Sequence, residues 1–286
     1  MKKLIYPFIS LLTVAAFCHS GYTEAVVTDG LVSYWTFDQQ DIADNTVIDV
    51  WGENDATIVG DPQVVAGQVK DALEFDGSDD YVNLTNLGDF GSHLGTSTFD
   101  VWIKTSFKRD WTTLFKVIDR DCSMGWGLDL NASSHFDQIV FKKDAISRYI
   151  RHKLGENGCK SSTAGTLVSI FDGKWHHIVH VNDTYVDKAG LELREQSLYI
   201  DGELHTPGLT NVTALDTFIP FVEAVYLGAG NNRGKAEGFF RGRIDEVRIY
   251  NRPLTHAEVR QNFEMGLSVE PVQKLPTVWG ALKTKL

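Results

Sequence analysis

The 286-residue chain has few cysteines and methionines and a shortage of positive charge. It contains three cysteines and three methionines, and its 38 acidic side chains outnumber 27 lysines and arginines to give a formal net charge of −11. Because phosphate binding needs a basic face, this balance argues against nucleic acid as the main partner. A net charge of this sign also keeps an exported protein dispersed. The charge therefore excludes more partners than it identifies.

Apolar runs that could cross a bilayer are also missing beyond the N-terminus. Residues 1–3 are basic, residues 4–17 form an apolar stretch that Pro7 interrupts, and residues 23–25 make a small-x-small exit. This pattern is typical of a secretory signal peptide, and the stretch is too short and broken for a membrane anchor. We predict a leader over residues 1–25, no transmembrane segment, and a secreted, periplasmic or cell-surface location. The alternative is an N-terminal core helix.

Loss of that leader would remove Cys18 and leave only Cys122 and Cys159. An even pair of cysteines in an exported chain indicates one disulfide. Two unrelated buried thiols are the alternative interpretation.

Helical periodicity is scarce, and short strand-like runs dominate. Residues 31–37 alternate, and most later runs end at glycine, aspartate or asparagine turns. The Asp201-Gly202 pair predicts a two-residue hairpin turn. Residues 72–75 and 81–84 predict a second hairpin across an acidic turn. Many short strands with such punctuation indicate a sandwich or barrel.

One helix is predicted near the C-terminus, where we expect it to close one end of the sandwich. Thr255 and Glu258 have capping-box spacing, and Gly266 supplies the stop. Residues 267–286 contain two prolines and read as a tail rather than a domain.

An ordered set of segments resembles one superfamily. The set consists of residues 30–38, 72–82, 175–179, 198–202 and 240–254. In this order they resemble a laminin G-like jelly roll of the concanavalin A-like lectin and glucanase superfamily. The resemblance implies an all-β, two-sheet antiparallel jelly-roll sandwich over residues 26–266, with one short C-terminal helix. It is specific for the fold and not for a ligand.

Alternation along the last strand orients its side chains within such a sandwich. Val247 is expected to face inward, while Arg248 and Tyr250 face outward. Because Asp245 and Glu246 are adjacent, alternation sends them to opposite faces.

The carboxylate pattern bears on catalysis. The enzymes of the superfamily that this sequence resembles are mostly glycoside hydrolases. Their paired carboxylates lie on one strand, in a Glu-x-Asp-x-Glu type of spacing. No predicted strand carries this spacing. We therefore predict that the protein is not an enzyme and keep a divergent glycoside hydrolase as the less favoured alternative.

The resemblance also implies a structural calcium ion between the first and last strands. The matching aspartate is Asp245, with oxygen partners expected from Asp38 and from the Asp76-Gly77 turn. Hard oxygen ligands from distant segments suit calcium. The alternative is that these aspartates only cap turns and accept hydrogen bonds from backbone amides.

Candidate ligand-binding residues are the weakest part of the sequence pattern. Trp111 and Trp126 flank long polar loops, and an aromatic ring can stack on the apolar face of a sugar. Arg148 and Arg151 belong to a basic stretch that could meet sulfated or carboxylated glycans. The alternatives are core tryptophans and a hairpin whose lysines discourage edge pairing.

These observations favour an exported, non-catalytic binding module for carbohydrate or glycoprotein at the cell surface or outside the cell. A structural or adhesive protein–protein interaction domain without a sugar ligand is the alternative.

Overall fold

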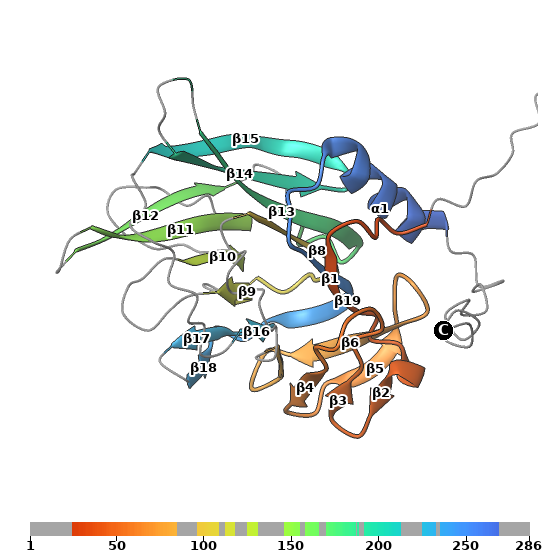
Figure 1. The fold of residues 1–286 in the computed structure, drawn as a ribbon. Helices are drawn as coiled ribbons and strands as arrows, with labels where there is room; N and C mark the ends of the chain where they lie inside the picture. Colours follow the sequence, from red (N-terminus) through yellow and green to blue (C-terminus); the bar gives the residue numbers. More distant parts are fainter. Residues whose placement is uncertain are drawn as a thin grey trace, which may run out of the picture.

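The computed structural model describes residues 25–84, 96–108, 112–117, 125–130, 146–154, 158–165, 170–186, 188, 192–212, 225–232 and 235–268. Two large antiparallel sheets stack on each other (Figure 1). This arrangement confirms the predicted all-β sandwich with one short C-terminal helix. No helix in the described ranges is both long and apolar enough to cross a membrane.

The first sheet has eight strands. In spatial order they are β15 (Glu203–Val212), β14 (Glu192–Ile200), β13 (Trp175–Val186), β8 (Ser97–Lys104), β19 (Arg241–Tyr250), β6 (Asp71–Asp76) and β5 (Gln63–Ala66), with β1 (Leu31–Trp35) also paired to β19. The predicted Asp201-Gly202 hairpin joins β14 to β15. Both turn residues have positive φ, 53° and 79°, as a type I′ turn requires.

The second sheet has nine strands. They are β12 (Gly158–Gly165), β11 (Ile146–Leu154), β10 (Gly125–Leu130), β9 (Thr112–Val117), β16 (Tyr226–Leu227), β7 (Tyr81–Asn83), β4 (Ala56–Val59), β3 (Thr46–Val47) and β2 (Ile42–Ala43). A small third sheet pairs β17 (Gly230–Asn232) with β18 (Lys235–Glu237), and a 3-10 turn spans Gln39–Asp41.

The turn after β6 does not form the predicted second hairpin. β6 pairs with β5 and β19 in the first sheet, whereas β7 pairs with β4 and β16 in the second. The chain therefore crosses from one sheet to the other at residues 77–80. Alternating sequence on both sides of a turn shows that two strands meet there, but not that they pair with each other.

The main core lies between the two sheets. It contains buried side chains from both, including Trp35, Phe75 and Val247. The rings of Phe99 on β8 and Phe115 on β9 stack with centroids 4.1 Å apart, so they join the sheets directly. Aromatic contacts of this kind add to the free energy gained by burying their area.

A second core lies on the outer face of the eight-stranded sheet, under α1 (His256–Ser268). Val259 of α1 packs with Val179, Tyr199 and Tyr250 in this cluster. The helix therefore covers the outer face of the sheet instead of closing one end (Figure 1). For this reason Arg248 and Tyr250 point away from the main core as predicted but are fully buried.

The start of α1 agrees with the sequence, and its end does not. Glu258 accepts a hydrogen bond from the Thr255 amide at 2.8 Å and donates its own amide to Thr255 Oγ1 at 3.3 Å, which is the predicted capping box. Gly266 lies inside the helix rather than ending it. A Cβ atom there would lie 2.7 Å from the Trp102 indole, so close packing against β8 explains this glycine.

Candidate functional site

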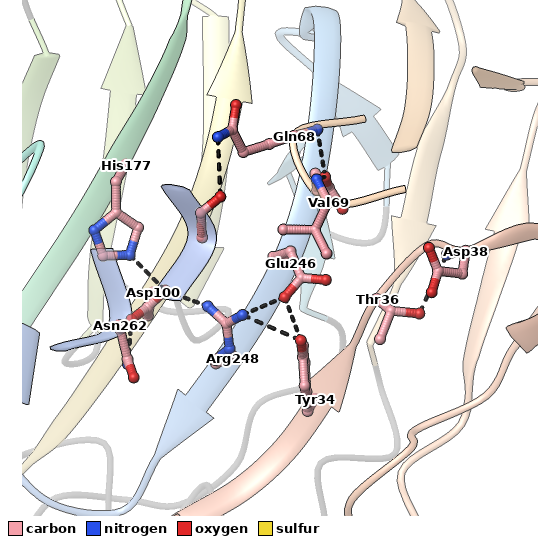
Figure 2. A network of polar contacts seen from close by, with 12 residues as sticks. Tyr34, Thr36, Asp38, Gln68, Val69, Asp100, His177, Glu246, Arg248 and Asn262 are labelled. Atoms are coloured by element: carbon pink, nitrogen blue, oxygen red, sulfur yellow. Dashed lines mark hydrogen bonds and ion pairs between the residues drawn. The ribbon is translucent and has the colours of Figure 1, made fainter. Parts of the chain in front are cut away.

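Beneath α1, the outer face of the eight-stranded sheet carries a buried network of charged side chains (Figure 2). Arg248 on β19 donates to Asp100 Oδ1 on β8 at 3.2 Å, to the Tyr34 hydroxyl at 3.1 Å and to Glu246 Oε2. Arg248 and both carboxylates are essentially inaccessible to solvent. The buried guanidinium is therefore paired with two carboxylates inside the protein.

Asp100 connects this network to the helix and to β13. Asn262 of α1 donates to Asp100 Oδ2 at 2.7 Å, and His177 Nε2 lies 2.9 Å from Asp100 Oδ1. Burial alone would raise the pKa of Asp100, but His177 and Arg248 together hold that pKa below its usual value. The carboxylate stays ionised and joins three strands to the helix.

A β-bulge at Glu246 places the charged residues of β19 on the same face. Asp245 pairs with Trp102 and Arg248 with Asp100, so three steps along β19 match two along β8, and Glu246 has a φ of 54°. The extra residue interrupts alternation. The prediction that Asp245 and Glu246 face opposite sides is therefore wrong.

Asp245 is fully buried and bonds to the loop after β5. Its Oδ2 accepts hydrogen bonds from the amides of Gln68 at 2.8 Å and Val69 at 2.9 Å. Its Oδ1 has no hydrogen-bond partner among the described residues. Burial, followed by the nearby charges of Glu246 and Asp38, raises the pKa of Asp245 well above its usual value.

The predicted calcium ligands do not form a single coordination sphere. Asp38 lies near enough to Asp245 to raise its pKa, and its own Oδ1 accepts the Asp71 amide at 3.2 Å while Lys70 lies 3.5 Å from its Oδ2. In strand register, Asp76 on β6 lies across from Arg241, which is four residues before Asp245 on β19. Gly77 directly follows Asp76. The set named from the sequence therefore divides between two places.

The Asp76 end of this set has a carboxylate cluster of its own. Ligand atoms of Asp76, Asp79 and Asp80 all lie within 4.8 Å of one another. Asp80 is buried, and its two oxygens accept the amides of Asp61 and Asp76, each at 2.9 Å. Burial raises the pKa of Asp80 above its usual value. Oxygen-only donors of this kind suit calcium better than a softer metal.

Beside this cluster, a pocket of about 620 Å³ opens on the outer face of the same sheet. Backbone register places Gln63, Glu74, Arg243 and Lys104 in one row across β5, β6, β19 and β8. We call this the outer-face pocket. Its lining residues are Asp61, Gln63, Glu74, Phe75, Asp76, Asp80, Lys104, Thr105, Ser106, Phe107, Gly173, Arg241, Gly242 and Arg243.

The outer-face pocket combines an aromatic ring with charges of both signs. Phe107 is 38 % exposed, and the Arg241 guanidinium lies 4.8 Å from its ring centroid. Glu74 accepts a hydrogen bond from Arg243 at 3.1 Å. No local sequence pattern indicates these residues, because the pocket forms only when β5, β6, β8 and β19 are in register.

Comparison with known families identifies the fold. The sequence profile described as the concanavalin A-like lectin/glucanases superfamily matches residues 76–260. The chain belongs to this superfamily. The resemblance stated from the sequence is thereby confirmed.

Solved structures with the same fold include both isolated domains and parts of larger proteins. Domain 4 of AbnA, a GH43 extracellular arabinanase from Geobacillus stearothermophilus in complex with arabinotriose, is 20 % identical with a TM-score of 0.55, over 81 % of this chain and 97 % of that domain. The Trypanosoma rangeli sialidase in complex with sialic acid is 19 % identical with a TM-score of 0.55, over 84 % of this chain and 33 % of the sialidase.

A third neighbour is the binding domain of botulinum neurotoxin DC in complex with SialylT. It is 12 % identical with a TM-score of 0.53, over 84 % of this chain and 52 % of the toxin domain. The chain thus spans about half of this neighbour and a third of the sialidase. At such identities the likeness shows the fold alone. No curated protein sequence matches the chain.

The residues predicted from sequence to bind a ligand lie in the other sheet or outside the described ranges. Trp126 belongs to β10, and Arg148 and Arg151 belong to β11, where Arg148 pairs with Leu128 and Arg151 with Gly125. Their side chains, like the whole of Trp111, lie outside the described residues. Their role in this superfamily member stays a prediction.

The predicted disulfide, leader and tail also involve residues outside the described ranges. Cys159 pairs with Lys153 in the β11–β12 ladder, but Cys122 lies outside the described residues. Residues 1–24 and 269–286 also lie outside them. The disulfide, the leader and the tail stay predictions.

Replacing Arg248 with methionine should strongly lower the free energy of unfolding of the protein. The change leaves Asp100 and Glu246 buried without their guanidinium partner, and breaking a buried pair in this way costs about 3–5 kcal/mol. Urea denaturation measures the loss of unfolding free energy. Arg260→Met, at an exposed position of α1, is the matched control and should change it by less than about 0.5 kcal/mol. Equal effects of the two substitutions would contradict the stabilising role given to Arg248.

His176 should make stability depend on pH. Its Nδ1 lies 2.8 Å from Asp201 Oδ2 and its Nε2 lies 3.1 Å from Asp172 Oδ1, and the contact with Asp201 is the main cause that raises the pKa of His176. A raised folded-state pKa adds stability that is complete below the unfolded-state value of about 6.5 and is lost as pH rises through the folded-state pKa.

His176→Gln should therefore destabilise the protein more at about pH 5.5 than at about pH 8.5. Thermal unfolding of wild type and variant at both pH values measures the difference. His256→Gln is the control, because that exposed ring contacts the Gly202 carbonyl and no carboxylate of the described residues. A pH-independent effect of His176→Gln would refute the role given to the two aspartates.

Proposed function

We propose that the protein is an exported, non-catalytic carbohydrate-binding module. The observation that supports this function best is the outer-face pocket, in which the exposed Phe107 ring stands beside hydrogen-bond donors and acceptors. A sugar presents an apolar face that an aromatic ring can cover and hydroxyls that need polar partners. A volume of about 620 Å³ falls in the range of small-molecule sites.

The structural neighbours agree with this proposal. Three of them are described in complex with arabinotriose, with SialylT and with sialic acid. The chain covers 97 % of the length of the arabinanase domain. The leader predicted over residues 1–25 supports export.

The carboxylates of the described residues support binding rather than hydrolysis. Asp245 and Glu246 share a face because of the bulge, but both are fully buried, Asp245 under the loop after β5 and Glu246 against Tyr34 and Arg248, so no substrate can reach them. In the outer-face pocket, Asp80 lies close to Asp76, and its raised pKa suits a general acid. Both of its oxygens, however, already accept backbone amides. That arrangement favours a fixed acceptor over a proton donor.

A protein ligand is the second candidate. One neighbour, the binding domain of botulinum neurotoxin DC, is described in complex with rat synaptotagmin II, with 13 % identity and a TM-score of 0.52. The same sandwich can therefore present a surface to a polypeptide in place of a sugar.

A glycan array and a hydrolysis assay distinguish these possibilities. We expect the purified protein to bind a subset of immobilised glycans and to release no reducing sugar from a panel of polysaccharides. Reducing-sugar release that disappears in Asp76→Asn would establish a hydrolase instead. An array without any bound glycan would exclude the carbohydrate-binding function and leave the protein–protein alternative.

The proposal includes a structural calcium ion at the Asp76 end of the predicted set. Asp76, Asp79 and Asp80 offer clustered oxygens at the crossing from β6 to β7, where an ion would hold the two sheets at that rim. Asp245 fits this role less well, because it belongs to no comparable cluster of three carboxylates among the described residues.

Calcium should therefore raise the melting temperature of the wild type, and a chelator should reverse the change. At about 100 times its Kd, a ligand adds about 2.7 kcal/mol to the unfolding free energy. Asp79→Asn should abolish the response, whereas Asp245→Asn should keep it. A wild type that does not respond to calcium, or a response that Asp245→Asn alone removes, would rule out this site.

A further inference from the structure

We infer that the outer-face pocket binds a carboxylated sugar, with its carboxylate on Lys104 and Arg241 and its hydroxyls on the neighbouring acidic side chains. The inference rests on the proposed function and specifies its ligand class.

Two cations of the pocket are left without a carboxylate. Arg243 is bonded to Glu74 at 3.1 Å and to the Ala66 carbonyl at 3.2 Å. Lys104 and Arg241, in contrast, form no ion pair with a carboxylate of the described residues. Their N–H groups are therefore available to an incoming anion.

These two cations can converge on one group. Lys104 pairs with Arg243 across β8 and β19, so Arg241 is its diagonal neighbour on the same face. Diagonal neighbours in an antiparallel pair stand about 7–8 Å apart, within reach of long side chains. The planar fork of a guanidinium matches a planar carboxylate with two parallel hydrogen bonds, and a lysine adds a point charge.

The Arg241 side chain is held in place before any ligand arrives. Its guanidinium lies over the Phe107 ring, and its carbonyl accepts a hydrogen bond from Thr105 Oγ1 at 2.7 Å. The same hydroxyl accepts the Phe107 amide at 3.1 Å, so the ring and the cation are fixed to each other. Prior ordering of this kind reduces the entropy cost of binding.

The acidic wall of the pocket, where Asp76 lies directly across from Arg241 in strand register, selects for hydroxyls and against a second anionic group. Asp61 and Asp76 line it with exposed carboxylates, and Asp80 lies behind them with its oxygens on their amides. Carboxylates accept hydrogen bonds from hydroxyls but repel a multiply charged ligand. A neutral sugar would leave the two cations unpaired, and a polysulfated chain would face this acidic wall. A sugar with a single carboxylate satisfies both the cations and the acidic side chains of the pocket.

Isothermal titration calorimetry with matched probes tests the inference. Galacturonic acid and sialyllactose, each with a single carboxylate, are the charged probes, and galactose and lactose are their neutral counterparts. We expect at least one carboxylated probe to bind about tenfold or more tightly than its counterpart, because charge-assisted hydrogen bonds are the stronger ones. Added salt should weaken that binding.

Variants then locate the binding. Arg241→Gln and Lys104→Gln should each weaken it about tenfold or more, and Arg241→Lys should fall between wild type and Arg241→Gln because it keeps the charge and loses the fork. Arg260→Gln on α1 removes the same charge from an exposed side chain outside the pocket and should leave the Kd unchanged. Melting temperatures confirm that each variant is folded.

The outcomes separate this inference from the proposed function. Binding that Arg241→Gln and Lys104→Gln leave intact would overturn the assigned site. Neutral probes that bind as tightly as carboxylated ones, or carboxylated probes that fail to bind, would overturn the ligand class. In either case, hits on the glycan array would leave the carbohydrate-binding function standing, whereas an empty array would remove both.

Discussion

The buried guanidinium of Arg248 is the constraint on which the outer half of this sandwich depends. A charge can leave water only if partners replace its hydration, and Asp100, Glu246 and Tyr34 supply them. Asn262 of α1 then bonds the remaining oxygen of Asp100. The helix that covers the sheet is thus fixed by polar contacts with defined geometry as well as by apolar burial. A sheet with an exposed outer face would not need any of these groups.

The β-bulge at Glu246 makes this network possible and also divides β19 into two parts with different roles. After the bulge, Arg248 and Tyr250 lie in the covered region. Before it, Arg241 and Arg243 lie in regular register with β6 and β8 and face the outer-face pocket. One extra residue therefore lets a single strand contribute a cation to a buried network at one end and two cations to an open site at the other.

The sequence predicted what depends on local pattern and missed what depends on long-range packing. The sandwich, the Asp201-Gly202 turn and the Thr255–Glu258 capping box follow from alternation and from a few residues in a row, and all three are present. The bulge at Glu246 was not predicted, because the alternation argument assumes a regular strand. The burial of Arg248 was not predicted, because an amphipathic strand gives no indication that a helix covers its polar side. The outer-face pocket was not predicted either, because its row of side chains from Gln63 to Lys104 forms only through the register of four strands.

The reach of α1 decides which polar residues are structural and which can meet a ligand. Along the outer face of β8, Asp100 lies under Asn262, and Trp102 packs against Phe263 and Gly266. Lys104, two residues further on, lines the pocket. Perturbed pKa values usually point to functional groups, and Asp245 has such a value, yet it lies on the covered side with no route to solvent. Access to solvent therefore matters more here than a shifted pKa, and the charges just beyond the end of the helix are the ones that a ligand can reach.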